Sequence, residues 1–238
     1  IAEGTGALVL DVKVGSGAFM KDLDSARELA ETMVALGTDA GLTTVALLTD
    51  MSTPLGLTAG NAIEVQESID VLAGGGPADV VELTLALARE MLAAVGHGGV
   101  DPAAKLADGS AMDVWRAMIA AQGGDVGAPL PQAKESQALA SPSSGVLTRL
   151  DALAVGTAAW RLGAGRARKE DLVQAGAGVV LHAKPGDRVE AGQPLFTLLT
   201  DEPARFVRAE ESLAGAYDID GSADSSAGAR EIILDMVR

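Results

Sequence analysis

A glycine-rich loop follows the first apolar run of the sequence. The run covers Ala7–Val12, and the loop after it contains Gly15, Gly17 and Phe19. In open α/β sheets, ligands bind beyond the carboxyl ends of the parallel strands, and glycines let backbone N–H groups come close to a substrate. The spacing matches neither the dinucleotide-binding pattern G-x-G-x-x-G nor the phosphate loop G-x-x-x-x-G-K-[ST]. The segment is therefore either a ligand-contacting loop or a bare tight turn.

Charged side chains stand at the ends of two expected strands. Asp11 and Asp50 could act together as general acid and base, and the alternative is that they cap loop amides. Lys13 could attract an anion, or it forms an ion pair with Asp11. His97 and His182 lie in no recognisable nucleophile context, so the sequence predicts no covalent catalysis by a protein side chain.

Two further glycine motifs lie in the second half of the chain. Gly163–Arg166 resembles a phosphate-cradling turn, but it follows an expected helix and is better interpreted as a helix C-cap. Gly186–Leu195 has the form G-D-x-V-x-x-G-x-P-L, which looks like the turn of biotinyl and lipoyl carrier domains. A carrier needs a modifiable lysine on the hairpin tip, and residues 196–202 contain no lysine. The motif predicts a barrel-like module without the swinging-arm chemistry.

The elements that would position these residues alternate between strand and helix in the first half of the chain. Continuous apolar runs predict buried strands, and apolar residues spaced three and four apart predict helices. Asp22 and Asp24 supply capping oxygens, and Ser25 with Glu28 forms a capping box. The expected elements are a strand at 7–12, a helix at 23–41, a strand at 43–49, and helices at 63–72, 77–95, 101–102 and 110–122. This order predicts an α/β fold with a parallel or mixed sheet flanked by helices.

The periodicity changes after residue 130. Residues 123–142 are rich in Gly, Pro, Ser and Gln and indicate a linker. Strands are expected at 145–150, 178–182, 194–199 and 231–237, with helices at 155–162 and 206–214. We therefore predict two domains: residues 1–130 form part of an α/β domain, and residues 131–238 form a smaller α+β module of the barrel-sandwich type.

Composition excludes several classes of function. The 33 acidic and 18 basic side chains give a net charge of −15, and three Phe, two Trp and one Tyr are the only aromatic residues. An acidic surface with few aromatic rings disfavours nucleic acid, and the apolar runs end well before the about 20 residues of a membrane-spanning helix. With no cysteine and two histidines, a zinc site is not expected. The composition predicts a cytoplasmic protein with no nucleic-acid or membrane partner.

Several motifs, taken together, resemble those of thymidine phosphorylase and pyrimidine-nucleoside phosphorylase. They are Asp11–Met20 (DVKVGSGAFM), Leu47–Met51 (LLTDM), Pro54–Gly56 (PLG) and Gly60–Val65 (GNAIEV). The resemblance continues through Gly163–Arg166, Val180–His182, Gly186–Asp187 and Gly192, and leaves out the acidic stretch 218–228. It implies a small helical domain joined to a large α/β catalytic domain, followed by a barrel-like C-terminal module.

The resemblance also implies a reaction. Enzymes of this family use inorganic phosphate as co-substrate and convert a pyrimidine nucleoside to its free base and sugar 1-phosphate, so that thymidine gives thymine and 2-deoxyribose 1-phosphate in nucleoside salvage. Phosphate attacks the anomeric carbon through an oxocarbenium-like state, and domain closure aligns the reactants. The intact enzyme is expected to be a homodimer. Two alternatives remain: a non-catalytic, carrier-like binding module, and a related phosphorylase acting on nucleoside monophosphates.

Four residues of this chain match functional positions of the family. The counterpart of Phe19 lines the pyrimidine pocket. A monovalent cation, K⁺, is held by backbone carbonyls matching Leu55 and Thr58 and by the carboxylate matching Glu67, an all-oxygen set that hard cations select. In the alternative interpretation Phe19 is a core residue, and Glu67 is a solvated residue on a helix face.

Other functional segments of the family have no match here. Its phosphate-binding Lys-x-Ser-Thr-Gly-Gly segment and its base-binding Arg, Ser and Lys lie upstream of the DVKVG motif. The present sequence opens at Ile1, a few residues before an expected buried strand. We therefore expect a fragment of a longer phosphorylase, with no catalytic residue in this chain and no activity on its own.

Overall fold

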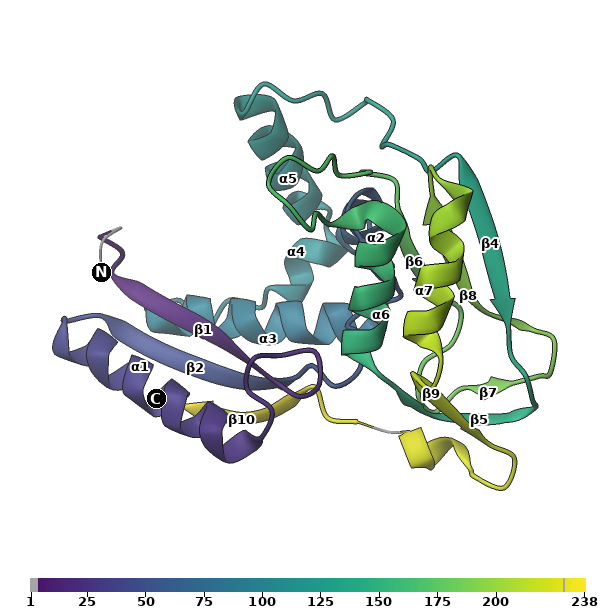
Figure 1. Cartoon of the computed structure of the whole chain (residues 1–238). Helices are drawn as coiled ribbons and strands as arrows, with labels where there is room; N and C mark the ends of the chain where they lie inside the picture. The colour runs from purple at the N-terminus through teal and green to yellow at the C-terminus, as the bar shows by residue number, and fades with distance from the viewer. Residues whose placement is uncertain (1–3, 229) are drawn as a thin grey trace. The chain divides into compact units, whose positions relative to one another are not determined.

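The computed structural model describes residues 4–228 and 230–238 and divides into two compact units (Figure 1). The first unit comprises residues 1–51, 70–124 and 231–238, and the second comprises residues 52–69 and 125–230. Each unit therefore contains segments that are far apart in the sequence. These units interleave along the chain, so they mark no single boundary in the sequence. The predicted domain boundary at residue 130 stays a prediction.

A three-stranded mixed sheet forms the centre of the first unit. Strand β1 (Ala7–Val14) pairs in parallel with β2 (Thr43–Asp50), and β10 (Ile233–Val237) pairs antiparallel with the other edge of β2. Every residue of β2 from Thr44 to Thr49 is buried, as expected for a central strand that is covered on both faces. The α/β fold with a mixed sheet and flanking helices is thus confirmed.

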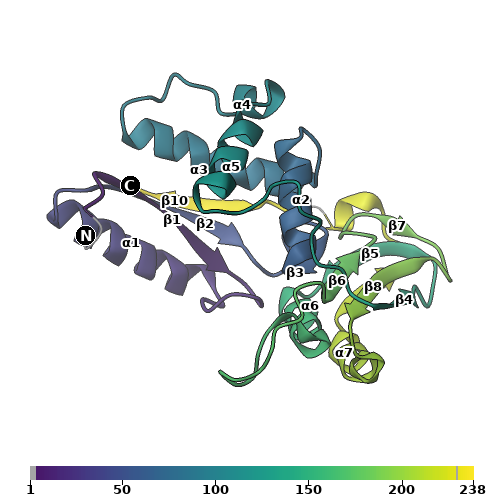
Figure 2. The ribbon, with the colours of Figure 1, turned by 90° about the horizontal axis from the view of Figure 1, so that it is seen from above.

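Helices cover both faces of this sheet. Figure 2 shows α1 (Leu23–Asp39) and α3 (Ala78–Ala94) on opposite sides of it. Helix α1 buries Ala26, Ala30 and Val34, which are spaced four residues apart and so share one face of the helix. The remaining helices assigned wholly to this unit are α4 (Ala103–Ala107) and α5 (Ser110–Ala121), and α2 (Ala62–Leu72) passes from the second unit into the first.

The capping of α1 confirms one part of the sequence prediction. Asp22 was expected to supply a capping oxygen, and it is the N-cap: its carboxylate accepts a hydrogen bond of 2.8 Å from the backbone N–H of Ser25, so the cap is not a box that begins at Ser25. That hydrogen bond, together with one from the Ser25 hydroxyl, lowers the pKa of Asp22. The helix begins at Leu23, as expected, and the carboxylate at its N-cap also interacts favourably with the helix dipole.

Strand β10 was predicted correctly as a strand but assigned to the second module. It lies instead in the sheet of the first unit, where Arg27 of α1 forms an ion pair with Asp235. The guanidinium of Arg238 lies 2.9 Å from the carboxylate of Glu90 on α3. The sequence did not indicate this position, because strand pairing across such a separation depends on tertiary packing rather than on local pattern.

Two antiparallel sheets build the second unit. The first has the order β3-β6-β8-β4 and the second the order β7-β5-β9. Their strands are β3 (Thr58–Gly60), β4 (Glu135–Ala140), β5 (Gly145–Leu150), β6 (Gly178–Leu181), β7 (Arg188–Val189), β8 (Pro194–Thr200) and β9 (Tyr217–Asp220). Both sheets are open, so the described strands form no closed barrel.

Helices α6 (Ala152–Ala159) and α7 (Phe206–Leu213) lie side by side in this unit, as Figure 1 shows. They share one apolar core with both sheets, and α6 contributes the fully buried Val155. The largest fully buried side chain among the described residues is Phe196 of β8, whose ring centroid lies 5.5 Å from that of Tyr217 on β9. A π-helical turn (Trp160–Ala164) continues α6, and a 3₁₀ turn (Pro203–Arg205) precedes α7.

Strand β4 lies within the segment that the sequence indicated as a linker. Its residues Glu135–Ala140 pair antiparallel with β8. The polar and small residues of this strand carry little β-propensity, so its formation follows from the partner strand. The short strands β3, β7 and β9 were likewise not predicted, since two to four residues are too few to show an alternating pattern.

An ion pair between β5 and β9 predicts that the stability of the fold depends on pH. The guanidinium of Arg149 donates a hydrogen bond of 2.6 Å to Asp218, and this bond lowers the pKa of the Asp218 carboxyl. A lowered pKa in the folded state stabilises the protein above the unfolded value of about 4, and this stabilisation is lost as the pH falls through the folded value.

The substitution Asp218→Asn should reduce the free energy of unfolding at pH 7 by about 0.5–1 kcal/mol, since the pair is largely exposed. Urea denaturation should show that the difference narrows as the pH falls below about 4. In an Arg149→Met background the same substitution should have little further effect. A constant difference between pH 7 and pH 3 would refute the assignment.

Candidate functional site

The glycine-rich loop after β1 closes on its own backbone. The N–H of Gly15 donates to the Met20 carbonyl at 2.9 Å, and the N–H of Ala18 donates to the Gly15 carbonyl at 3.1 Å. The N–H of Gly17 donates to the Met51 carbonyl at 2.9 Å. Gly15 has a φ of +128°, a conformation that residues with a Cβ rarely adopt. These three N–H groups are thus hydrogen-bonded to backbone carbonyls and form a tight turn. This turn exposes a side chain to solvent.

That side chain is Phe19, which is 98% exposed. The alternative that Phe19 is a core residue is therefore wrong. Lys21 stabilises the loop beneath it, since its ammonium group donates to the carbonyls of Ser16 at 2.9 Å and Ala18 at 2.7 Å. An aromatic ring held in the open on a braced turn can contact a flat ligand, and the role of Phe19 in binding the pyrimidine stays a prediction.

The two carboxylates considered for acid–base chemistry lie apart. Asp11 is opposite Leu47 in the parallel ladder, whereas Asp50 is opposite Val14, so three residues, or about 10 Å along the strands, separate them. Asp11 instead pairs with Lys13 at 2.7 Å and accepts a hydrogen bond of 2.5 Å from the hydroxyl of Thr49. The interpretation of Lys13 as the ion-pair partner of Asp11 is confirmed.

Glu67 lies against the loop that contains Leu55 and Thr58. Its carboxylate accepts a hydrogen bond of 2.7 Å from the backbone N–H of Leu57, in a partly buried position. The side chain therefore contacts this loop, whereas the alternative interpretation left it solvated on a helix face. The structure thus brings Glu67 to Leu57, one of the two residues between the predicted carbonyl ligands Leu55 and Thr58.

Thr58, the residue after Leu57, carries a buried polar group. Within the described part of the chain, its buried hydroxyl has no hydrogen-bond partner. Among the same residues there is no group of three or more His, Cys, Asp or Glu side chains that could hold a metal ion. A cation at this loop would therefore depend on backbone carbonyls and one carboxylate, an all-oxygen ligand set that suits a hard cation. Binding of K⁺ by Leu55, Thr58 and Glu67 stays a prediction.

The Gly163–Arg166 segment forms a helix end. Gly163 has a φ of +113° within the π-helical turn, and its carbonyl accepts a hydrogen bond of 2.9 Å from the N–H of Gln174. The N–H groups of Ala167 and Arg168, which could have faced a phosphate, both donate to the Asp171 carboxylate, at 3.0 and 2.8 Å. These contacts favour the interpretation as a C-cap.

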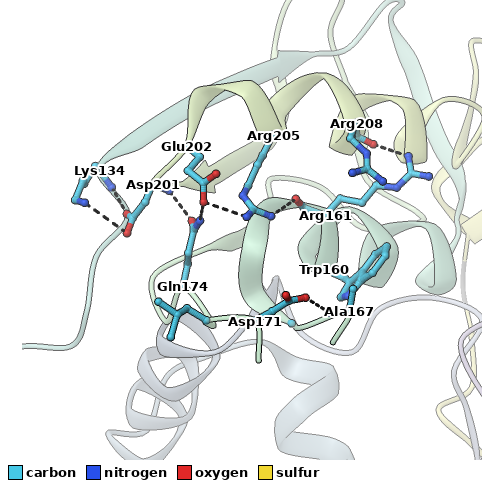
Figure 3. A pocket seen from close by; sticks show the side chains of 12 residues that line it. Lys134, Trp160, Arg161, Ala167, Asp171, Gln174, Asp201, Glu202, Arg205 and Arg208 are labelled. Atoms are coloured by element: carbon cyan, nitrogen blue, oxygen red, sulfur yellow. Dashed lines mark hydrogen bonds and ion pairs between the residues drawn. The ribbon is translucent and has the colours of Figure 1, made fainter. Parts of the chain in front are cut away.

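A pocket of about 720 Å³ lies beside this helix end (Figure 3). Basic and acidic side chains line it together, and several are paired: Arg205 lies 3.0 Å from Glu202, and Lys134 lies 3.8 Å from Asp201. The other lining residues are Trp160, Arg161, Gly165, Ala167, Asp171, Leu172, Gln174 and Arg208. This pocket was not predicted from the sequence, because its three arginines, Arg161, Arg205 and Arg208, come from separate segments.

Comparison with known proteins bears on both units. The sequence model of the pyrimidine nucleoside phosphorylase C-terminal domain matches residues 146–220, and that of the glycosyl transferase family, a/b domain, matches residues 1–112. Thymidine phosphorylase of Mycobacterium tuberculosis strain H37Rv is 56% identical over 237 residues, which cover 100% of this chain and 55% of that protein. The chain belongs to the thymidine phosphorylase and pyrimidine-nucleoside phosphorylase family.

Two other phosphorylases of this family show the same coverage. Pyrimidine-nucleoside phosphorylase of Geobacillus stearothermophilus is 44% identical over 212 residues, covering 84% of this chain and 49% of that protein. The enzyme of the same name from Bacillus subtilis strain 168 is 41% identical over 229 residues, covering 92% of this chain and 52% of that protein. The chain thus spans about half the length of these phosphorylases.

The carrier-like motif Gly186–Leu195 falls within the residues that match the phosphorylase C-terminal domain. Its turn is held by Asp187, whose carboxylate accepts a hydrogen bond of 2.8 Å from the N–H of Lys184. Strands β7 and β8 flank the second turn at Gly192, which has a φ of +86°.

In the described residues no helix has the length and apolar character needed to cross a membrane.

The exposure of Phe19 generates a prediction that separates binding from folding. In the full-length phosphorylase, Phe19→Ala should change the free energy of unfolding by less than about 0.5 kcal/mol, because an exposed ring contributes little to packing. The same substitution should raise the KM for the pyrimidine nucleoside.

Urea denaturation and steady-state kinetics on the same preparation measure both quantities. The matched control is Phe196→Ala in the core of the second unit, which should cost about 3–5 kcal/mol. An unchanged KM in Phe19→Ala would remove Phe19 from the binding site.

Proposed function

We propose that the protein containing these 238 residues catalyses the phosphorolysis of pyrimidine nucleosides in nucleoside salvage. Thymidine and inorganic phosphate would give thymine and 2-deoxyribose 1-phosphate. The observation that supports this proposal is the 56% identity, across the whole chain, with a thymidine phosphorylase. The match of residues 1–112 to a glycosyl transferase domain supports the transfer of a pentosyl group.

The reaction needs no protein nucleophile. An oxygen of phosphate forms a bond to the anomeric carbon while the bond from that carbon to the base nitrogen breaks, and the departing base takes up a proton. The enzyme must orient phosphate and nucleoside and stabilise the charge that develops between them. This chemistry is consistent with the absence of a recognisable nucleophile motif in the sequence.

The chain described here would supply one wall of such a site. The exposed ring of Phe19 would contact the pyrimidine, and the Gly15–Met20 turn would hold that ring in place. The sequence contains no Lys-x-Ser-Thr-Gly-Gly segment, which in this family binds phosphate. Residues 1–238 alone should therefore show no turnover, because they lack the groups that position the attacking oxygen.

The loop beside Glu67 would hold a potassium ion. The N–H of Leu181 donates to the Leu57 carbonyl at 2.7 Å, which makes Leu57 and Leu181 a hydrogen-bonded pair of the antiparallel ladder. The next pair, Thr58 and Val180, is then of the non-hydrogen-bonded kind. Because β3 is an edge strand, the Thr58 carbonyl points away from the sheet and is available to a cation. When bound, the ion supplies positive charge near the phosphate.

Two further features of the whole protein belong to the proposal. The family resemblance implies a homodimer formed through a helical domain, and the acidic composition without cysteines suits the reducing cytoplasm. We propose that the full-length phosphorylase is a homodimer and that it is located in the cytoplasm.

The activity is tested with purified full-length protein, thymidine and phosphate, by following the release of thymine. We expect release that requires phosphate and is saturable in both substrates. Parallel reactions with uridine and with pyrimidine nucleoside monophosphates define the substrate class. Release from the monophosphates alone would favour the related phosphorylase, and no phosphate-dependent release from any of them would refute the proposal.

The potassium site is tested with Glu67→Gln. This variant keeps an acceptor for the Leu57 N–H but removes the negative charge, so the K⁺ concentration for half-maximal activity should rise at least about tenfold, equivalent to 1.4 kcal/mol. The matched control is Glu64→Gln: Glu64 lies on the same helix and its carboxylate also accepts from a backbone amide, that of Gly60, at 2.7 Å.

Glu64→Gln should leave the response to potassium unchanged. Equal potassium dependence in wild type and Glu67→Gln would contradict the cation site.

A further inference from the structure

Lys184 is fixed by its backbone in the turn that follows β6. The carbonyl of Lys184 accepts a hydrogen bond of 2.9 Å from the N–H of Asp187, and the Asp187 carboxylate accepts one of 2.8 Å from the N–H of Lys184. The N–H of Gly186 donates to the Leu147 carbonyl of β5 at 2.8 Å. Lys184 thus lies two residues before the carrier-like motif Gly186–Leu195, and the motif residues Gly186 and Asp187 hold its turn in place.

The side chain of Lys184 reaches a loop that is about 130 residues distant in the sequence. Its Nζ donates a hydrogen bond of 2.8 Å to the carbonyl of Gly56 and a second hydrogen bond to the carbonyl of Pro54, in a partly buried position. An ammonium group carries three N–H donors on a single charged atom, so it can bind several carbonyl oxygens that converge on one point. Gly56 has a φ of +70°, and this sharp bend favours that convergence.

These two hydrogen bonds are made by the residues immediately before and after Leu55. The Pro54 and Gly56 carbonyls belong to the peptide planes before and after that of the Leu55 carbonyl, so one ammonium group fixes both neighbouring planes. The next residue, Leu57, is held through its N–H by Glu67 and through its carbonyl by Leu181, both at 2.7 Å. The orientation of the Leu55 carbonyl is therefore determined by bonds on each side of it.

We propose that Lys184 is a positioning residue for the potassium site, where its ammonium group acts as a tethered monovalent cation that holds the loop in the shape needed to bind a second, free cation. This inference rests on the cation site proposed above. The ammonium group and K⁺ carry the same charge and both bind carbonyl oxygens. Lys184 orders Pro54 and Gly56 on one side, and the ion binds Leu55 and Thr58.

The test uses the full-length enzyme with Lys184→Met, which keeps the length of the side chain and removes its charge and donors. The K⁺ concentration for half-maximal phosphorolysis should rise at least about tenfold, since the variant loses both hydrogen bonds from a charged group that order the loop. At saturating K⁺ the kcat should return to within about threefold of wild type, because Lys184 touches no reacting atom. The matched control is Lys169→Met, at an exposed lysine of the same unit.

A second variant covers the case in which Lys184→Met does not fold. Lys184→Arg keeps the charge, but a planar guanidinium cannot place one nitrogen between both carbonyls. We expect its half-activating K⁺ concentration to lie between those of wild type and Lys184→Met. A folded Lys184 variant with the potassium response of wild type would overturn the proposal, even if its melting temperature were lower, since a purely structural role lowers stability alone.

Amide hydrogen exchange separates this inference from the cation site itself. Without K⁺, exchange at the N–H groups of Leu57 and Leu181 should be at least about tenfold faster in Lys184→Met than in wild type. A wild-type enzyme indifferent to potassium would refute the cation site, and faster exchange would then still show that Lys184 orders the loop. Unchanged exchange would refute the ordering as well.

Discussion

The backbone hydrogen bonds of Leu57 hold together the part of the chain on which the proposed cation site depends. The Leu57 N–H is bound by Glu67 and its carbonyl by the N–H of Leu181, each at 2.7 Å. One bond ties the loop to the following helix, and the other ties it to strand β6, more than a hundred residues further along the chain. Both bonds are partly shielded from water, and a donor or acceptor left without a partner in such a place lowers the free energy of unfolding. The loop between Ser52 and Thr58 therefore cannot change shape without breaking contacts with two separate elements.

Local pattern was sufficient to predict the elements of the first unit. The apolar runs at β1 and β2 and the helical spacing of α1 act over a few residues, and the structure places these elements within two residues of the expected bounds. The first turn of α1 was less accurately predicted, because Asp22 and Ser25 are both good caps and geometry decides between them. Strands β4 and β10 depended on partners far away in the sequence, so their sheet positions could not be derived from pattern.

The candidate site shows the same division between local and distant information. The resemblance to phosphorylases indicated Phe19 and Glu67, and the structure shows one as an exposed ring and the other as a partner of the Leu57 amide. Lys184 could not be found in this way. It precedes the carrier-like motif by two residues, and its role becomes visible when the fold brings its ammonium group to Pro54 and Gly56. The pocket near Gly165 was also missed, since its arginines come from separate segments.

The acidic stretch near the end of the second unit illustrates why charge alone does not define a site. The Asp220 carboxylate accepts hydrogen bonds from the N–H and hydroxyl of Ser222, and Asp224 does the same with Ser226. The serine hydroxyls, followed by the backbone N–H groups, lower the pKa of both carboxyls. Each Asp-x-Ser unit closes its own turn in this way. The carboxylates of Asp220 and Asp224 therefore stabilise the backbone conformation of the segment that they make acidic.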